Sequence, residues 1–338
     1  MVAYRNVETP GRQAVIVDTD AGPDDLIALA YLLEREDVQI DLIVSVNGVA
    51  HAEAGANNVA RLLRAANRRI PVYIGQDQPL DGQVAFPEDW RTTADTLPGV
   101  TLPDLTTADL RRQAQQGPRR GPRPDMRRQP RPDGVNAILD RLRTATTPVR
   151  ILALGPLTNI ASVIQRDRKL LANISDIVVM GGAIDVPGNA PEKATSPVAE
   201  WNIYVDPAAA GIVFRSGIPI TLVPLDATNQ VPVDREFVSD FLARRRSVVG
   251  VTVGQLFALA QPMIDAHAFY AWDPLAAAVL TNPGIVRTRD MAIDVVHTGE
   301  EVGRLKVRDT DPNMDVAYTA SAAEFREVFF GALTHGRM

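Results

Sequence analysis

Short runs of apolar, β-branched residues alternate along the chain with longer amphipathic segments. The runs are continuously apolar, a pattern typical of parallel strands that are buried on both faces. The predicted strands are residues 14–17, 40–46, 72–74, 149–154, 176–180 and 219–223. Helices are predicted between them, at residues 23–36, 52–67, 134–145 and 206–217.

This alternation predicts the α/β fold class, with an open, mostly parallel, doubly wound (Rossmann-like) sheet and helices on both faces. After residue 230 the pattern is mainly helical, with one late strand at 291–296. The 338 residues contain no internal repeat, and we expect a single domain over residues 1–338. In such sheets ligands bind beyond the carboxyl ends of the strands, so the residues that follow strands are the first candidates for a site.

Composition narrows the function classes. The net charge is −6 and no clustered basic face is evident outside one segment, which disfavours a nucleic-acid partner. The chain has no cysteine, which excludes disulfides and thiolate chemistry. Neither a signal sequence nor an apolar run of the roughly 18–20 residues that a membrane helix needs is present. We therefore expect a cytoplasmic protein that binds neither nucleic acid nor membrane.

One segment departs from the rest. Residues 111–134 carry eight arginines against two aspartates, together with several prolines and glycines. Such a composition buries little apolar surface, so we predict a mobile loop. A solvated insertion is favoured over a lid that attracts an anionic ligand.

The stretch DTDAGPDD places four aspartates in residues 18–25, between a predicted buried strand and the helix that follows it. A helix N-terminus favours a negative charge by only about 0.3–1 kcal/mol, which could explain Asp24 and Asp25 as capping residues. It does not explain Asp18 and Asp20 as well, because crowded carboxylates repel. A hard cation with oxygen ligands, Ca²⁺ or Mg²⁺, resolves that repulsion.

A second interpretation of these aspartates is a phosphatase of the haloacid-dehalogenase type, which also has Asp-x-Asp after its first strand. There the first aspartate is a nucleophile, and an apolar segment follows. Here AGPDD follows and begins a helix at once.

The aspartate motif resembles the DxDxGxDD signature of nucleoside hydrolases, which cleave the N-glycosidic bond of ribonucleosides. Further stretches resemble that family in the same order along the chain. They are LALGPLTNIA (152–161), VVMGGA (178–183), GN (188–189), AEWNIYVDPAAA (199–210) and WDP (272–274).

The resemblance implies one Ca²⁺ per subunit. Asp20, Asp25 and Asp273 would be its side-chain ligands, and the main-chain carbonyl of Leu154 would add another. Asp20 would also be the general base toward a water that the ion orients. Asp18 would support the loop from behind these ligands.

The resemblance also assigns the sugar contacts. Asp24 and Asn202 would hold the 2′- and 3′-hydroxyls, Asn189 and Glu200 the 5′-hydroxyl, and Met180 would line the ribose. Loss of the base gives the ribose oxocarbenium character, as in glycoside hydrolysis. A homodimer or homotetramer is the assembly that the resemblance implies.

The leaving base is predicted from two tryptophans. Family members that favour pyrimidines or accept all bases usually have a histidine just before the late aspartate, whereas this chain has Trp272. Trp272 and Trp90 resemble the pair that sandwiches the base in the purine-specific inosine–adenosine–guanosine subgroup. The sequence therefore predicts a purine nucleosidase, with inosine, adenosine and guanosine as substrates. The alternative for both tryptophans is a packing role, which is what we predict for Trp201.

One departure concerns the segment after the second strand. Broad-specificity relatives have valine–glycine–asparagine there, and Val49 occupies the place of that asparagine. Asn47 lies two residues earlier and is predicted to support the site. His51 and His267 could reach the site, but a structural role is favoured for each.

Three alternatives to a purine nucleosidase stay open at this point. They are a broad-specificity or pyrimidine-preferring nucleoside hydrolase, the Mg²⁺-dependent phosphatase, and a protein that binds nucleoside or ribose without turnover.

Overall fold

The computed structural model describes residues 12–81, 85–105, 133–190 and 198–334. The predicted loop at 111–134 lies outside the described residues up to residue 132. Its last two positions are described. Asp133 is the N-cap of a helix that begins at Gly134, and its carboxylate accepts from the backbone N–H groups of Val135 and Asn136.

The described residues form one nine-stranded sheet in the order β3-β2-β1-β4-β5-β6-β9-β7-β8. Strands β1 to β6 and β9 pair in parallel, whereas β7 runs antiparallel to both β9 and β8. The strands are β1 (Gln13–Thr19), β2 (Val38–Ser45), β3 (Val72–Ile74), β4 (Val149–Ala153), β5 (Ile174–Met180), β6 (Ile220–Val223), β7 (Val286–Val295), β8 (Leu305–Arg308) and β9 (Met314–Ala320). The predicted α/β class with an open, mostly parallel sheet is confirmed.

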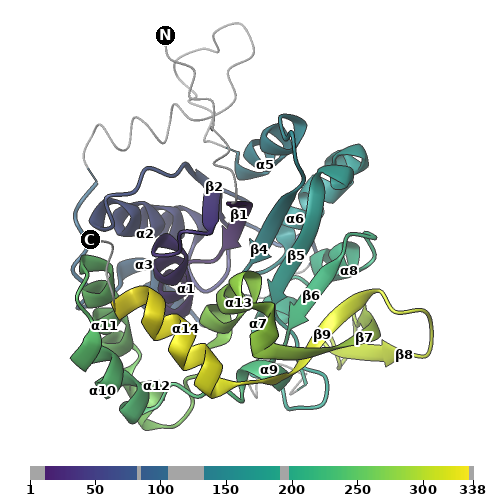
Figure 1. Ribbon diagram of the computed structural model, residues 1–338. Coiled ribbons are helices and arrows are strands. Elements are labelled where there is room, and N and C mark those ends of the chain that lie inside the picture. The colour runs from purple at the N-terminus through teal and green to yellow at the C-terminus, as the bar shows by residue number, and fades with distance from the viewer. Residues whose placement is uncertain (1–11, 82–84, 106–132, 191–197, 335–338) are drawn as a thin grey trace, which may run out of the picture.

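Helices cover both faces of the sheet. They are α1 (Pro23–Leu33), α2 (Ala52–Ala65), α3 (Glu88–Thr96), α5 (Gly134–Arg143), α6 (Thr158–Arg166), α7 (Trp201–Val205), α8 (Pro207–Phe214), α9 (Leu225–Thr228), α10 (Arg235–Arg244), α11 (Val248–Leu259), α12 (Gln261–Asp265), α13 (Trp272–Thr281) and α14 (Ala322–Thr334). Two short 3₁₀ helices span Arg168–Asn173 and Pro283–Ile285. Figure 1 shows α5, α6 and α8 on one side of the sheet and α1, α13 and α14 on the other.

The central strand explains why its apolar run does not alternate. Val15 and Val17 pack in the core beneath α1, α2, α11 and α13, whereas Ile16 packs in the core beneath α5, α6 and α8. All three side chains are fully buried. A strand with a helical layer on each face must be apolar on both, which is the pattern that the sequence displays.

The C-terminal part contains more strand than its pattern predicted. The late strand β7 begins at Val286, and β8 and β9 were not predicted. Much of β7 and β8 is exposed and carries charged residues, such as Arg287, Arg289 and Lys306. Antiparallel strands at the edge of a sheet need little apolar surface, so periodicity gives only a weak signal for them.

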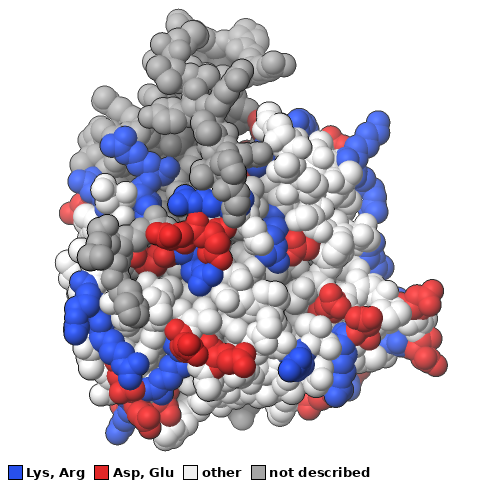
Figure 2. Space-filling view, viewed as in Figure 1, with Lys and Arg blue, Asp and Glu red and all other residues white. Residues whose placement is uncertain are grey.

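The surface and the helices bear on the predicted partners. On the face seen in Figure 2, acidic and basic side chains are interspersed over the described part of the chain. Within the same described part, no helix combines the length and the apolar character needed to cross a bilayer.

Candidate active site

The aspartate motif forms the turn between β1 and α1. Asp18 lies in β1, Asp20 follows the strand, and Asp24 and Asp25 lie in the first turn of α1. Ala21 has a left-handed backbone (φ 56°), which is rare for a residue with a Cβ and is typical of functional turns. This conformation turns the chain sharply, so that strand end and helix start present their carboxylates to the same place.

The turn is held by hydrogen bonds to Asp25. Its carboxylate accepts from the Thr19 hydroxyl and, over 2.9 Å, from the backbone N–H of Gly22. Asp25 at the third helical position thus satisfies a backbone donor at the N-cap, as in a capping box. One carboxylate therefore has both a local structural partner and a place in the carboxylate cluster.

Three carboxylates come together although one is almost 250 residues away in sequence. Asp24, Asp25 and Asp273 each offer an oxygen, and these oxygens all lie within 4.8 Å of one another. Asp273 belongs to the first turn of α13, the helix that packs beside α1. This group includes Asp24, which the resemblance assigned to the sugar.

Asp20 is next to this group. Its carboxyl interacts with that of Asp25 and accepts a 2.7 Å hydrogen bond from the backbone N–H of Val49. A Cβ on Gly48 would lie 2.1 Å from an Asp20 carboxylate oxygen, so only glycine permits this approach. Val49 lacks the amide side chain of the broad-specificity relatives, but its backbone orients Asp20.

Burial raises the carboxyl pKa values throughout the cluster. Desolvation, together with the charge of Asp20, raises the pKa of Asp24 to about 7. Desolvation, together with the charge of Asp24, raises the pKa of Asp25 to about 6. The pKa values of Asp20 and Asp273 are also raised well above the usual range, by burial first and by neighbouring carboxylates second. Buried carboxylates of this kind become ionised most easily when a cation neutralises them.

Asp18 lies deeper and is 1% exposed. Its Oδ1 accepts a 2.7 Å hydrogen bond from Asn159, whose own Oδ1 accepts from the backbone N–H of Gln76 over 2.8 Å. Burial raises the Asp18 pKa to about 8 despite that hydrogen bond. Sequence reasoning included Asn159 in a motif but gave it no role. It connects the first strand to the loop after β3.

Two of the residues predicted to hold the sugar, Glu200 and Asn202, contact the segments that follow β4 and β5. Glu200 is the N-cap of α7, and its carboxylate accepts from the backbone N–H groups of Gly182, Asn202 and Ile203. Asn202 donates through Nδ2 to the carbonyl of Leu154 over 2.9 Å and to that of Met180 over 3.3 Å. The Leu154 carbonyl therefore points into the site and is within reach of a polar group.

Charge links this group to the aspartates. Burial raises the Glu200 pKa to about 7, and Asp20 contributes to that shift. Asn189 lies close to Glu200 in space: its Oδ1 accepts a 3.1 Å hydrogen bond from the backbone N–H of Trp201, the residue that follows Glu200.

The two tryptophans predicted to stack on a base lie on different helices. Trp90, on α3, is 43% exposed, and its ring centroid lies 5.8 Å from that of Trp201. Trp201 is itself stacked on Phe86 at 4.5 Å. Trp272 begins α13, is partly buried beside Phe269, and leaves its buried indole N–H without a partner among the described residues.

Three further residues considered from the sequence lie outside the carboxylate cluster. Asn47 follows β2, and its Oδ1 accepts a 2.6 Å hydrogen bond from Arg91. Sequence reasoning missed Arg91. The side chain of His51 is half exposed and pairs with Asp95 at 2.7 Å. His267 is exposed, in a left-handed turn.

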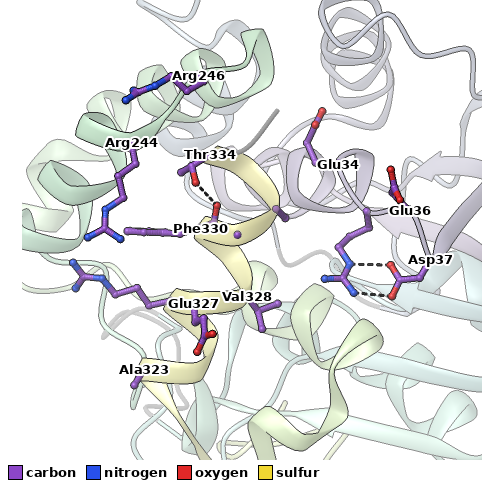
Figure 3. A pocket seen from close by; sticks show the side chains of 14 residues that line it. Glu34, Glu36, Asp37, Arg244, Arg246, Ala323, Glu327, Val328, Phe330 and Thr334 are labelled. Carbon is purple, nitrogen blue, oxygen red and sulfur yellow. Dashed lines mark hydrogen bonds and ion pairs between the residues drawn. The ribbon is translucent and has the colours of Figure 1, made fainter. Parts of the chain in front are cut away.

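A separate hollow of about 1440 Å³ lies at the other end of α1. It is lined by residues of both charge signs, among them Arg35 and Asp37, which form an ion pair (Figure 3). Asp24 and Asp25 are in the first turn of α1, whereas this hollow begins beyond its last residue. It is therefore distinct from the carboxylate cluster.

Comparison with known proteins agrees with this geometry. Residues 15–327 match the family model for inosine-uridine preferring nucleoside hydrolases. The chain is 28% identical to the probable uridine nucleosidase 2 of Oryza sativa subsp. japonica, over 96% of this chain and 95% of that protein. It is 30% identical to the pyrimidine-specific ribonucleoside hydrolase RihA of Salmonella agona, over 87% of this chain and 88% of that protein. The purine-preferring ribonucleoside hydrolase of Gardnerella vaginalis has a similar fold, with a TM-score of 0.78, 23% identity, and coverage of 95% of this chain and 98% of that chain.

Proposed function

Because the chain belongs to the inosine-uridine preferring nucleoside hydrolase family, we propose that it hydrolyses the N-glycosidic bond of purine ribonucleosides, releasing free base and ribose. The observation that carries the proposal is the group of three buried carboxylates, Asp20, Asp25 and Asp273, with the partly buried Asp24 beside them, at the carboxyl end of β1.

The donor set of this cluster fits a hard divalent cation, and we propose Ca²⁺. Asp20, Asp25 and Asp273 would hold it, together with the carbonyl of Leu154. Asp24 joins Asp25 and Asp273 in the group of close oxygens, so it is a further candidate ligand. When bound, the ion would supply Lewis-acid activation of water and an anchor for the ribose hydroxyls.

Asp20 is proposed as the general base. The Val49 N–H fixes one oxygen of the Asp20 carboxylate, which orients the group to accept a proton. Its side chain is only 2% exposed, so the proton of the attacking water is transferred away from bulk solvent.

The ribose would be held from the β4 and β5 side. Asn202 and Asp24 are proposed to bind the 2′- and 3′-hydroxyls, and Glu200 and Asn189 the 5′-hydroxyl, with Met180 against the ring. Glu200 is fixed by three backbone donors, which preorganises its carboxylate before substrate arrives. Binding energy from the hydroxyls can then be used to position and distort the sugar.

The purine preference is the more specific part of the proposal. Trp272 replaces the histidine of pyrimidine-preferring members, and Trp90 is exposed at the rim. A base stacked on an aromatic ring gains about 1–3 kcal/mol in nucleic-acid systems. The names of the rice and Salmonella relatives favour the second candidate, a uridine or pyrimidine nucleosidase.

One experiment separates the two candidates. The protein is incubated with inosine and with uridine in Ca²⁺, and free base and reducing sugar are measured. We expect a higher kcat/KM for inosine, and Trp272→Ala to lower inosine cleavage more than cleavage of a riboside with an activated leaving group. Faster uridine cleavage would transfer the proposal to pyrimidines.

The two non-family alternatives have their own signatures. A phosphatase would release inorganic phosphate in the presence of Mg²⁺ and would carry a phosphoryl group on Asp18. A protein without turnover would bind inosine and release no ribose. The assembly proposed from the resemblance, a homodimer or homotetramer, is measured by sedimentation of the same preparation.

A further inference from the structure

Arg91 is unusual for its place in the fold. Helix α3 is mostly exposed, and its described buried side chains are Arg91 and Ala94, at a spacing that forms one inward face. An apolar residue is expected at such a position, but Arg91 is an arginine that is only 5% exposed.

The guanidinium of Arg91 forms few hydrogen bonds within the described part of the chain. One terminal nitrogen donates to Asn47 Oδ1 over 2.6 Å, whereas the buried Nε has no hydrogen-bond partner there. Its one described side-chain partner, Asn47, is a neutral amide and not a carboxylate. Burying a charge without a partner is costly, so such an arrangement indicates a ligand that completes it.

Arg91 lies beside the carboxylate cluster, on the β2 side. Its partner Asn47 directly precedes Gly48, whose backbone abuts Asp20, and Val49, whose N–H is bonded to Asp20. The residue before Arg91 is Trp90, exposed at the rim. Arg91 is thus connected through Asn47 to the segment that contacts Asp20, and it directly follows Trp90, one of the two residues proposed to stack on the base.

The strand order indicates which end of the substrate reaches Arg91. The sequence β2-β1-β4-β5 places Asn47 on one side of Asp20, and Leu154 and Met180 on the other. This step rests on the proposed function. With the 2′- and 3′-hydroxyls at the aspartates and the 5′-hydroxyl at Glu200, the base, at the opposite end of the ribose ring, extends toward β2.

We propose that Arg91, oriented by Asn47, is a specificity residue that donates a hydrogen bond to a ring oxo group of the leaving base. A guanidinium is always protonated and has donors only, so it matches an oxo group and opposes an amino group. At carbon 6 of a purine or carbon 4 of a pyrimidine, it favours the oxo group of hypoxanthine, guanine and uracil over the amino group of adenine and cytosine. As the glycosidic bond breaks, its electron pair moves onto the base, and the hydrogen bond strengthens with the charge on the oxo oxygen.

The test compares nucleosides that differ only in the group at carbon 6 of the purine or at carbon 4 of the pyrimidine. The kcat/KM values for inosine, adenosine and purine riboside, which has hydrogen at the same carbon, are measured for the wild-type protein and for Arg91→Met, with uridine and cytidine as a second pair. We expect Arg91→Met to lower the inosine-to-purine-riboside ratio about ten- to a hundredfold, the range for losing a hydrogen bond from a charged donor. The ratio of uridine to cytidine falls in the same direction.

Arg61→Met is the matched control. Arg61, on α2, also has a buried Nε without a partner among the described residues, but it is only partly buried and its terminal nitrogens donate to two acceptors, Asn58 and the Leu102 carbonyl. This variant should leave the substrate ratios unchanged. Arg91→Gln keeps a terminal donor without the charge and should give an intermediate ratio. It also serves if Arg91→Met does not fold.

The outcomes are distinguishable. If the wild-type protein releases no base from any of these nucleosides, the proposed function fails. If it does, and both Arg91 variants slow all substrates equally or leave the ratios unchanged, Arg91 has a structural role only and the inference is overturned.

Discussion

Asp20 combines three constraints in a single side chain. It is buried, it lies against other carboxylates, and one of its oxygens is fixed by the N–H of Val49. Each constraint alone is compatible with a structural residue. Together they keep one carboxylate in a fixed orientation, close to its neighbours, which is the arrangement expected of a group that moves a proton.

Replacing Asp20 by asparagine tests this role. Asp20→Asn keeps the shape and the acceptor for Val49 but removes the base and one negative charge. We expect kcat for nucleoside hydrolysis to fall about 10²–10⁴-fold, the usual contribution of a general base, while thermal unfolding stays near that of the wild type. Asn159→Leu, which removes the amide that supports Asp18, is a control for indirect effects. Near-normal turnover in Asp20→Asn would remove Asp20 from the base role.

At the residue scale, the sequence points to a site most clearly where side chains of one chemical type cluster, and the fold places Asp24 and Asp25 close to Asp273. Four aspartates in residues 18–25 cannot be explained by helix capping, and the resemblance supplied Asp273. Arg91 was missed because a single arginine on a polar, exposed helix carries no pattern. Its burial arises only when α3 packs beside α2 and Arg91 reaches Asn47, in the loop after β2.

At the scale of elements, the apolar strands of the parallel sheet were predictable, since both faces are buried and the runs are uninterrupted. The charged strands β7 and β8 were not fully predictable. The short α7 also lacks a periodic signal, because it has five residues. It forms because Glu200 caps its first turn and the next residues, up to Asp206, are buried.

Asp206 joins three elements and gives a prediction at this scale. Its carboxylate accepts from the Leu80 N–H over 2.8 Å, from the Thr158 hydroxyl over 2.6 Å and from Ala209 N–H over 2.9 Å, where it caps α8. Asp206→Ala leaves these buried donors unpaired, so we expect the free energy of unfolding to drop by about 2–4 kcal/mol. Urea unfolding of the wild type and the variant measures this difference in the free energy of unfolding.

Asp133→Ala is the matched comparison for Asp206→Ala. Asp133 also caps a helix, but it is partly exposed, so its loss should cost about 1 kcal/mol. Equal losses in the two variants would mean that the links from Asp206 to Leu80 and Thr158 contribute nothing beyond an ordinary cap.

At the scale of the whole molecule, the fold brings together segments that are far apart in the chain. The ends of β1, β2, β4 and β5 meet at one edge of the sheet, and α13 adds Asp273 from the C-terminal part. Parallel topology makes this meeting a consequence of strand order, which the alternation of strands and helices made predictable in outline. The hydrogen-bond partners of each carboxylate depend on side-chain packing, for which the sequence has no comparable signal.

The cluster also makes stability depend on pH in a direction that can be derived. The pKa values of Asp18, Asp24, Asp25 and Glu200 are raised to about 8, 7, 6 and 7 in the folded chain. Between the ordinary carboxyl pKa and these values, the folded chain holds more protons than the unfolded chain. The free energy of unfolding of the metal-free protein therefore falls as pH rises through this window.

A bound cation should oppose that loss, because it favours the ionised carboxylates. We expect Tm in EDTA to decrease from pH 5 to pH 8, and the increase in Tm on adding Ca²⁺ to be larger at pH 8 than at pH 5. At a Ca²⁺ concentration of 100 times Kd the stabilisation is about 2.7 kcal/mol. Thermal scans of the wild type and of Asp25→Asn, with and without Ca²⁺, measure both effects. The variant should lose most of the response to Ca²⁺. A Ca²⁺-induced rise that is equal at both pH values, or that survives in Asp25→Asn, would place the ion away from these carboxylates.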